Sequence, residues 1–101
     1  GRQILSPESV QAMTSNQLTA DQRTAGDLFL DVQGWGYGGS VDIAPAHPWN
    51  VPGRYGWVGG TGTSAYIVPA TRSVAILLTQ VGIGPQPPRG LLDFWGYASH
   101  G

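Results

Sequence analysis

The sequence contains no cysteine, no lysine and few charged residues of either sign. Without cysteine there are no disulfides, thiolate metal ligands or cysteine nucleophiles. Without lysine the 101 residues hold no lysine base, Schiff base or P-loop lysine. Charged residues make up 11% of the chain, against about 25% in ordinary soluble domains. The five arginines are isolated from one another, so we expect no surface for nucleic acid.

Metal sites and membrane spans are also disfavoured. The two histidines, His47 and His100, lie at a spacing that does not suit a metal site. No apolar run approaches the roughly 20 residues that span a bilayer, and no signal peptide is visible. We therefore expect no metal, no cofactor and no membrane span, and the composition leaves the cellular compartment open.

What remains is a sequence able to fold. It has 16 Gly and 8 Pro, but 41% of its residues are hydrophobic and 10% are aromatic, which argues against disorder. The pattern predicts a helix from Pro7 to about Gln17, capped by Ser6, and a short ordered segment at 27–30. A second helix is predicted from Gly90 to about Ser99. Four of its apolar residues fall on one face, namely Leu91, Leu92, Trp95 and Ala98.

Strands are predicted at 33–43, 54–60, 63–68 and 73–80, separated by loops rich in Gly and Pro at 44–53 and 82–88. The segment 73–80 is apolar without alternation, which is typical of a strand covered on both faces. It needs a neighbour on each edge, and the other strands supply one, so we expect a partner there. The sequence predicts an α+β fold, with an antiparallel sheet of three to four strands and a helix at each end.

Several short motifs resemble functional sites but are better explained by structure alone. Gly34, Gly36 and Gly39 match G-x-G-x-x-G, but the residues that follow cannot form the helix of a dinucleotide site, which favours a glycine-rich strand. The run at 59–64 resembles a phosphate loop without its lysine. We interpret His47 as a solvent-exposed loop residue. No serine occurs in a G-x-S-x-G elbow, so a self-contained Ser-His-Asp triad is not expected.

One long segment carries a family resemblance. The sequence GRYGWVGGTGT at 53–63, followed by SAYIVPATRSVAILLTQ, resembles the C-terminal part of the serine β-lactamase and penicillin-binding-protein-like superfamily. It is most similar to the branch with class C β-lactamases, DD-peptidases and related esterases. GWGYGGSV, SPESVQAM and FWGYA also resemble segments of that family. The resemblance implies that residues 1–101 form the C-terminal segment of such a hydrolase domain, part of a larger β-lactamase/transpeptidase-like fold, with the nucleophile-bearing part absent.

The resemblance also implies a site. The family uses Ser-x-x-Lys, Tyr-x-Asn or Tyr-x-Ser, and a third motif on a sheet-edge strand. Only the third has a counterpart here, Trp57-Val58-Gly59, because no Tyr in the expected upstream region is followed two places on by Asn or Ser. By resemblance, Gly60 is the catalytic residue that donates its backbone N–H to the oxyanion, whereas Trp57, Val58 and Gly59 bind substrate. Val58 lacks the hydroxyl that would hold a β-lactam carboxylate, which favours an esterase-like enzyme.

Two functions from different classes stay open. In the first, the intact protein is a serine hydrolase that acts through an acyl-enzyme on an ester, amide or β-lactam, and this chain alone is inactive. Its partner is then the N-terminal remainder of the same protein or another copy of this chain. In the second, four Trp and four Tyr on a small β-rich module form a non-catalytic binder of glycan or peptidoglycan.

Overall fold

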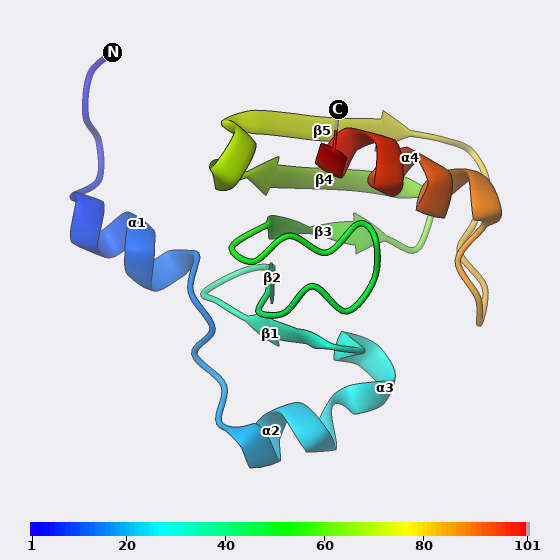
Figure 1. Cartoon of the computed structure of the whole chain (residues 1–101), viewed down its shortest axis with the longest axis horizontal. Coiled ribbons are helices and arrows are strands. Elements are labelled where there is room, and N and C mark those ends of the chain that lie inside the picture. The colour runs from blue at the N-terminus through cyan, green and yellow to red at the C-terminus, as the bar shows by residue number, and fades with distance from the viewer. Residues whose placement is uncertain (101) are drawn as a thin grey trace.

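An antiparallel sheet forms the centre of the structure, a computed structural model that describes residues 1–100 apart from the side chains of Phe29 and His100. In the described chain the sheet has five strands, paired in chain order from β1 to β5 (Figure 1). The elements are α1 (Pro7–Met13), α2 (Ala20–Ala25), α3 (Asp27–Leu30), β1 (Gln33–Trp35), β2 (Ser40–Asp42), β3 (Tyr55–Gly59), β4 (Thr63–Val68), the short 3₁₀ helix η1 (Pro69–Thr71), β5 (Ser73–Leu78) and α4 (Arg89–His100). The prediction of an α+β fold with helices toward both ends is confirmed.

The single strand predicted at 33–43 is wrong, because this segment forms a hairpin. Strands β1 and β2 pair with Gln33 opposite Asp42 and Trp35 opposite Ser40. A four-residue turn joins them, in which the N–H of Gly36 donates to the carbonyl of Gly39 over 2.9 Å. Gly38 in that turn has a φ of 124°, a conformation that glycine adopts without strain. The hairpin raises the number of strands from the predicted three or four to five.

Helix α1 begins as predicted but ends four residues earlier. Ser6 caps it by accepting a 3.1 Å hydrogen bond from the N–H of Ser9. Beyond Met13 the chain runs beside β1, where the N–H of Gln17 donates to the carbonyl of Trp35 over 2.8 Å. Helix α2 was not predicted, although a Thr-x-x-Gln capping box at Thr19 marks its start.

Two glycines of the G-x-G-x-x-G motif allow residues 13–17 to lie close to β1 and the turn after it. A Cβ at Gly34 would overlap the side chain of Asn16, and one at Gly36 would overlap the carbonyl oxygen of Met13. The motif is followed by β2 and not by the helix that a dinucleotide site requires. Close packing therefore explains Gly34 and Gly36.

Helix α4 covers one face of the sheet. Its Leu91 and Trp95 are buried against Tyr66 of β4, with Val58 and Leu77 packed around them. The indole N–H of Trp95 donates to the hydroxyl of Ser64 over 2.7 Å, which fixes the helix to β4. Because Ser64, Tyr66 and Val68 alternate along the strand, all three buried residues of β4 lie on this face.

The opposite face of β4 and β5 is bare within the described chain. Val74, Ile76 and Leu78 are 63%, 59% and 76% exposed, and Ile67 of β4 lies beside Val74 in the ladder. The prediction that this strand is covered on both faces is therefore wrong for this chain, because α4 covers only one. Strand β5 pairs with β4 and has no second neighbour among the described strands, as its sequence predicted.

This edge predicts self-association. Strand β5 carries neither a charge nor a proline, which are the usual protections of an exposed edge. We expect the isolated chain to form dimers or larger species in sedimentation velocity. Replacing Ile76 with Lys places a charge on the edge strand and should shift the population toward monomer. A wild-type chain that sediments as a monomer at all concentrations would contradict this expectation.

Candidate functional site

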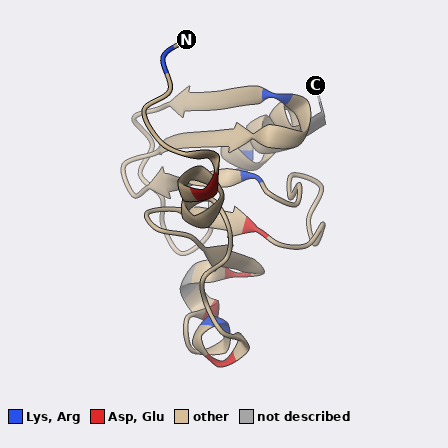
Figure 2. Ribbon diagram, turned by 90° about the vertical axis from the view of Figure 1, so that its left-hand side faces the viewer, with Lys and Arg blue, Asp and Glu red and all other residues tan. Residues whose placement is uncertain are grey.

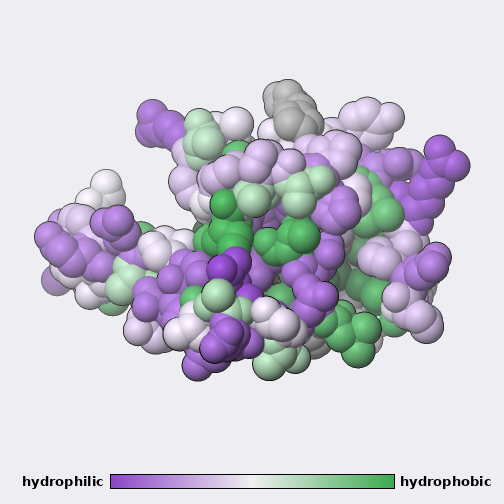
Figure 3. Space-filling model, turned by 60° about the horizontal axis from the view of Figure 1, so that its bottom comes forward, coloured by the Kyte–Doolittle hydropathy of each residue, from purple (hydrophilic) through white to green (hydrophobic). Residues whose placement is uncertain are grey.

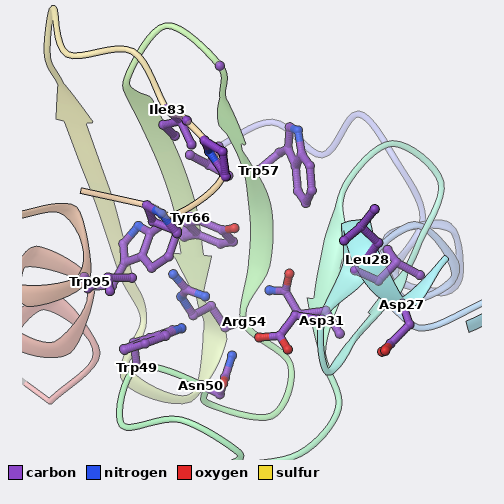
Figure 4. A pocket seen from close by; sticks show the side chains of 18 residues that line it. Asp27, Leu28, Asp31, Trp49, Asn50, Arg54, Trp57, Tyr66, Ile83 and Trp95 are labelled. Atoms are coloured by element: carbon purple, nitrogen blue, oxygen red, sulfur yellow. The ribbon is translucent and has the colours of Figure 1, made fainter. Parts of the chain in front are cut away.

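A cleft lies among α3, α4 and the two long loops. Its volume is about 760 Å³. Trp57, Val58 and Tyr66 contribute from β3 and β4, Trp49 and Asn50 from the loop before β3, and Ile83 from the loop before α4 (Figure 4). Thirteen of the eighteen lining residues are apolar or glycine, as in most binding clefts for small molecules.

A buried ion pair lies at one end of this cleft. The Arg54 side chain is 2% exposed, and its Nη1 donates to the Asp42 carboxylate over 3.4 Å. Asp42 is itself buried and accepts two further hydrogen bonds, from the Gln33 side chain and from the N–H of Val51. Charges are few elsewhere and dispersed along the chain (Figure 2). This pair therefore joins β1, β2 and the start of β3 through one carboxylate.

Aromatic rings surround the same arginine. The guanidinium carbon lies 3.5 Å from the centroid of the Tyr66 ring and 5.3 Å from that of Trp95. Tyr66 and Trp95 meet edge to face at 5.8 Å, and Trp49 lies 5.9 Å from Trp95. Ser99 of α4 ties down the loop by donating to the carbonyl of Trp49 over 2.8 Å. The arginine thus connects the sheet to α4 as well as to its neighbouring strands.

The structure places the predicted site residues together on β3 and the turn after it. Trp57, Val58 and Gly60 line the cleft. Val58 also packs on the cluster around Trp95, so it contributes to the core. Gly59 is not among the lining residues. A Cβ there would crowd the hydroxyl of Thr63 at 2.7 Å, which explains its glycine by hairpin packing.

Gly60 lies in a turn that the neighbouring loop holds in place. Its carbonyl accepts from the N–H of Ile83 over 2.9 Å, and the N–H of Gly62 donates to Gly59 over 3.0 Å. A Cβ built on Gly60 meets nothing within 4 Å, whereas one on Gly62 would overlap the Val81 carbonyl and the Thr79 hydroxyl. Gly62 is required by packing and by its φ of 92°, and Gly60 faces open space.

Strand β3 is the third strand of the described sheet and not an edge strand, contrary to the position that the resemblance implies. Strand β4 pairs with all of β3, from Tyr55 to Gly59. The ladder with β2 covers only Tyr55 and Gly56. The Val58 and Gly59 end of β3 therefore extends past β2, toward the cleft.

The histidine of the first long loop is less isolated than the sequence suggested. His47 Nε2 lies 2.9 Å from the Asp31 carboxylate, and the ring stacks on Trp49 at 4.7 Å. Its side chain is 38% exposed and it lies in the loop as expected, but the ring also has these two partners. No serine hydroxyl bonds to it among the described residues.

Sequence reasoning missed Arg54 and Asp42, which line or support the cleft, whereas it counted Trp49 only among the aromatic residues of the alternative binding module. Arg54 directly precedes β3 and Asp42 ends β2. A lone arginine beside a glycine-rich strand gives no signal of burial, because arginine is usually exposed. The pairing of these two residues depends on the hairpin, which the sequence reading did not resolve.

Comparisons with known proteins add no relative, since this chain matches no family model, no curated protein and no solved structure. Within residues 1–100 no helix has the length and apolar character to cross a membrane. In the same residues no three His, Asp or Glu side chains gather as metal ligands. On the face shown in Figure 3, hydrophobic residues gather toward the middle and the right, and hydrophilic residues prevail on the left.

The buried pair predicts a large loss of stability when its anion is neutralised. In Asp42→Asn the guanidinium of Arg54 stays buried without its carboxylate, which typically costs about 3–5 kcal/mol. The control is Asp93→Asn, because Asp93 is 57% exposed and lies 3.9 Å from Arg89; such surface pairs contribute about 0–1 kcal/mol. Urea unfolding followed by tryptophan fluorescence measures both. Equal losses in the two variants would show that the pair does not organise the fold.

Proposed function

We propose that this chain is the C-terminal part of a serine hydrolase of the β-lactamase-like superfamily, of the esterase, DD-peptidase or β-lactamase type. The proposal rests on where the structure places the residues that the resemblance assigns. The resemblance assigns Trp57, Val58 and Gly59 to substrate binding and Gly60 to the oxyanion, and of these Trp57, Val58 and Gly60 line the cleft. In the proposed enzyme the N-terminal remainder supplies the nucleophile and its lysine.

The proposed role of Gly60 is electrostatic. A backbone N–H directed at the developing oxyanion stabilises the transition state without any side chain. Since no Cβ blocks this position, a substrate carbonyl can approach the backbone closely. Trp57 then forms an apolar wall for the acyl or leaving group, and Val58 replaces the polar residue that would favour a β-lactam.

The alternative of a glycan-binding module draws less support from the rings. Stacking on a sugar requires a free aromatic face. One face of Trp49 is covered by His47, and one face of Tyr66 is covered by Arg54. These contacts are internal, which favours a structural use of Trp49 and Tyr66, whereas Tyr37 and Tyr97 are 63% and 79% exposed.

We predict that the isolated 101-residue chain hydrolyses neither p-nitrophenyl esters nor a chromogenic cephalosporin. An oxyanion donor gives little rate without an activated nucleophile, and the chain contains no lysine. Steady-state assays on purified chain test this. Turnover that co-purifies with the chain would contradict the proposal, and so would an intact gene without an upstream Ser-x-x-Lys.

Substitutions at Gly60 test its proposed role in the intact enzyme. Gly60→Pro removes the N–H but keeps the carbonyl that accepts from Ile83. Loss of one oxyanion donor lowers turnover by about 10²–10³, with a much smaller effect on ground-state binding. Gly60→Ala is the matched control, because it keeps the N–H and its Cβ meets open space.

Stopped-flow or steady-state kinetics on an ester substrate measures kcat and KM for both variants, with circular dichroism as the check on folding. We expect the proline variant to lose far more turnover than the alanine variant. Similar small losses in two folded variants would rule out the oxyanion role and leave Gly60 as a hairpin residue.

A further inference from the structure

One nitrogen of the buried arginine has no acceptor. Nη2 of Arg54 is inaccessible to solvent and makes no hydrogen bond among the described residues, while Nη1 donates to Asp42. A guanidinium remains charged and carries five N–H donors. A buried donor left without an acceptor costs about 1–3 kcal/mol, and native proteins rarely leave one unsatisfied.

This guanidinium lies at the wall of the cleft described above. Arg54 lines it, together with Tyr66, Trp95 and Trp49, and Figure 4 shows the guanidinium among these three rings. Nη2 itself is covered, and the Tyr66 ring lies 3.5 Å from the guanidinium carbon, so an oxygen in the cleft reaches Nη2 only if a neighbouring ring moves aside.

The charges around the cleft decide what kind of oxygen fits. The charge of Arg54 is already balanced by Asp42 at 3.4 Å. Two more carboxylates, Asp27 and Asp31, line the same cleft. A ligand carboxylate would be repelled by these groups, whereas the oxygen of a neutral carbonyl keeps its attraction to the guanidinium.

We propose that the cleft binds a neutral aromatic or apolar group with a carbonyl oxygen, which accepts a hydrogen bond from Nη2 of Arg54. The further claim that this group is part of the hydrolase's substrate rests on the proposed function. It then places a second carbonyl of the substrate at Arg54, apart from the reacting carbonyl at Gly60. The binding itself requires no hydrolysis.

The test uses acetophenone as the probe and ethylbenzene as its match without oxygen. Each is titrated into the ¹⁵N-labelled 101-residue chain, and the indole N–H signals of Trp49, Trp57 and Trp95 report binding. The Ile76→Lys background is used for all arms if the wild-type chain associates. Benzoate is the charged comparison, and we expect it to bind more weakly than acetophenone.

The double variant Arg54→Met, Asp42→Asn removes the donor without leaving a buried carboxylate unpaired. We expect the affinity for acetophenone to fall about tenfold, which corresponds to one hydrogen bond to a charged group. The affinity for ethylbenzene should change less than twofold. Val74→Ala on the bare face of β5 is the control and should change neither.

Where the double variant does not fold, the guanidinium signals of the wild-type chain give the answer. The Arg54 N–H resonances should shift with acetophenone and stay in place with ethylbenzene. Equal losses for both probes in a folded variant, unmoved Arg54 signals, tighter binding of benzoate, or no indole shift with either probe would overturn the proposal. None of these results bears on the Gly60 variants or on an upstream Ser-x-x-Lys, so the two proposals fail separately.

Discussion

A single buried arginine connects the parts of this small structure. Arg54 pairs with Asp42 of β2, stacks on Tyr66 of β4 and lies near Trp95 of α4. Removing two charges from water is costly, so the pair is favourable only while the surrounding hydrogen bonds are complete. Asp42 meets that condition through Gln33 and Val51, whereas Nη2 of Arg54 has no acceptor among the described residues. The position of the first long loop, and with it one wall of the cleft, therefore depends on this carboxylate.

The two edge strands of the sheet differ in how far other parts of the chain cover them. The N–H of Gln17 donates to Trp35 of β1, and the carbonyl of Met13 accepts from Tyr37 in the turn after β1, which protects that edge. At the other end β5 has no such cover in the described chain, and its outer face shows Val74, Ile76 and Leu78. An apolar surface of this kind is usual where another element packs. It fits the proposal that a further part of the protein, or another copy, covers β5.

The site joins a glycine-rich turn to an aromatic cleft. A Cβ at Gly60 would meet nothing within 4 Å, whereas one at Gly62 would overlap the Val81 carbonyl and the Thr79 hydroxyl. The two glycines look equivalent in the sequence, and only their neighbours separate a structural glycine from one that can face a ligand. In the proposed hydrolase, Gly60 acts on the reacting carbonyl and Arg54 on a second oxygen further along the cleft.

The sequence by itself determined the strands β3, β4 and β5, the start of α1 and the helix α4, because β-branched runs, a Ser-Pro cap and helical spacing are local signals. It also predicted that β5 lacks a neighbour on one edge. The tertiary structure alone decided the hairpin at 33–42, since that turn depends on Gly38 and on residues 13–17 alongside it. It likewise decided the burial of Arg54 and the bond between His47 and Asp31. Such contacts join residues distant in the chain, and no local pattern encodes them.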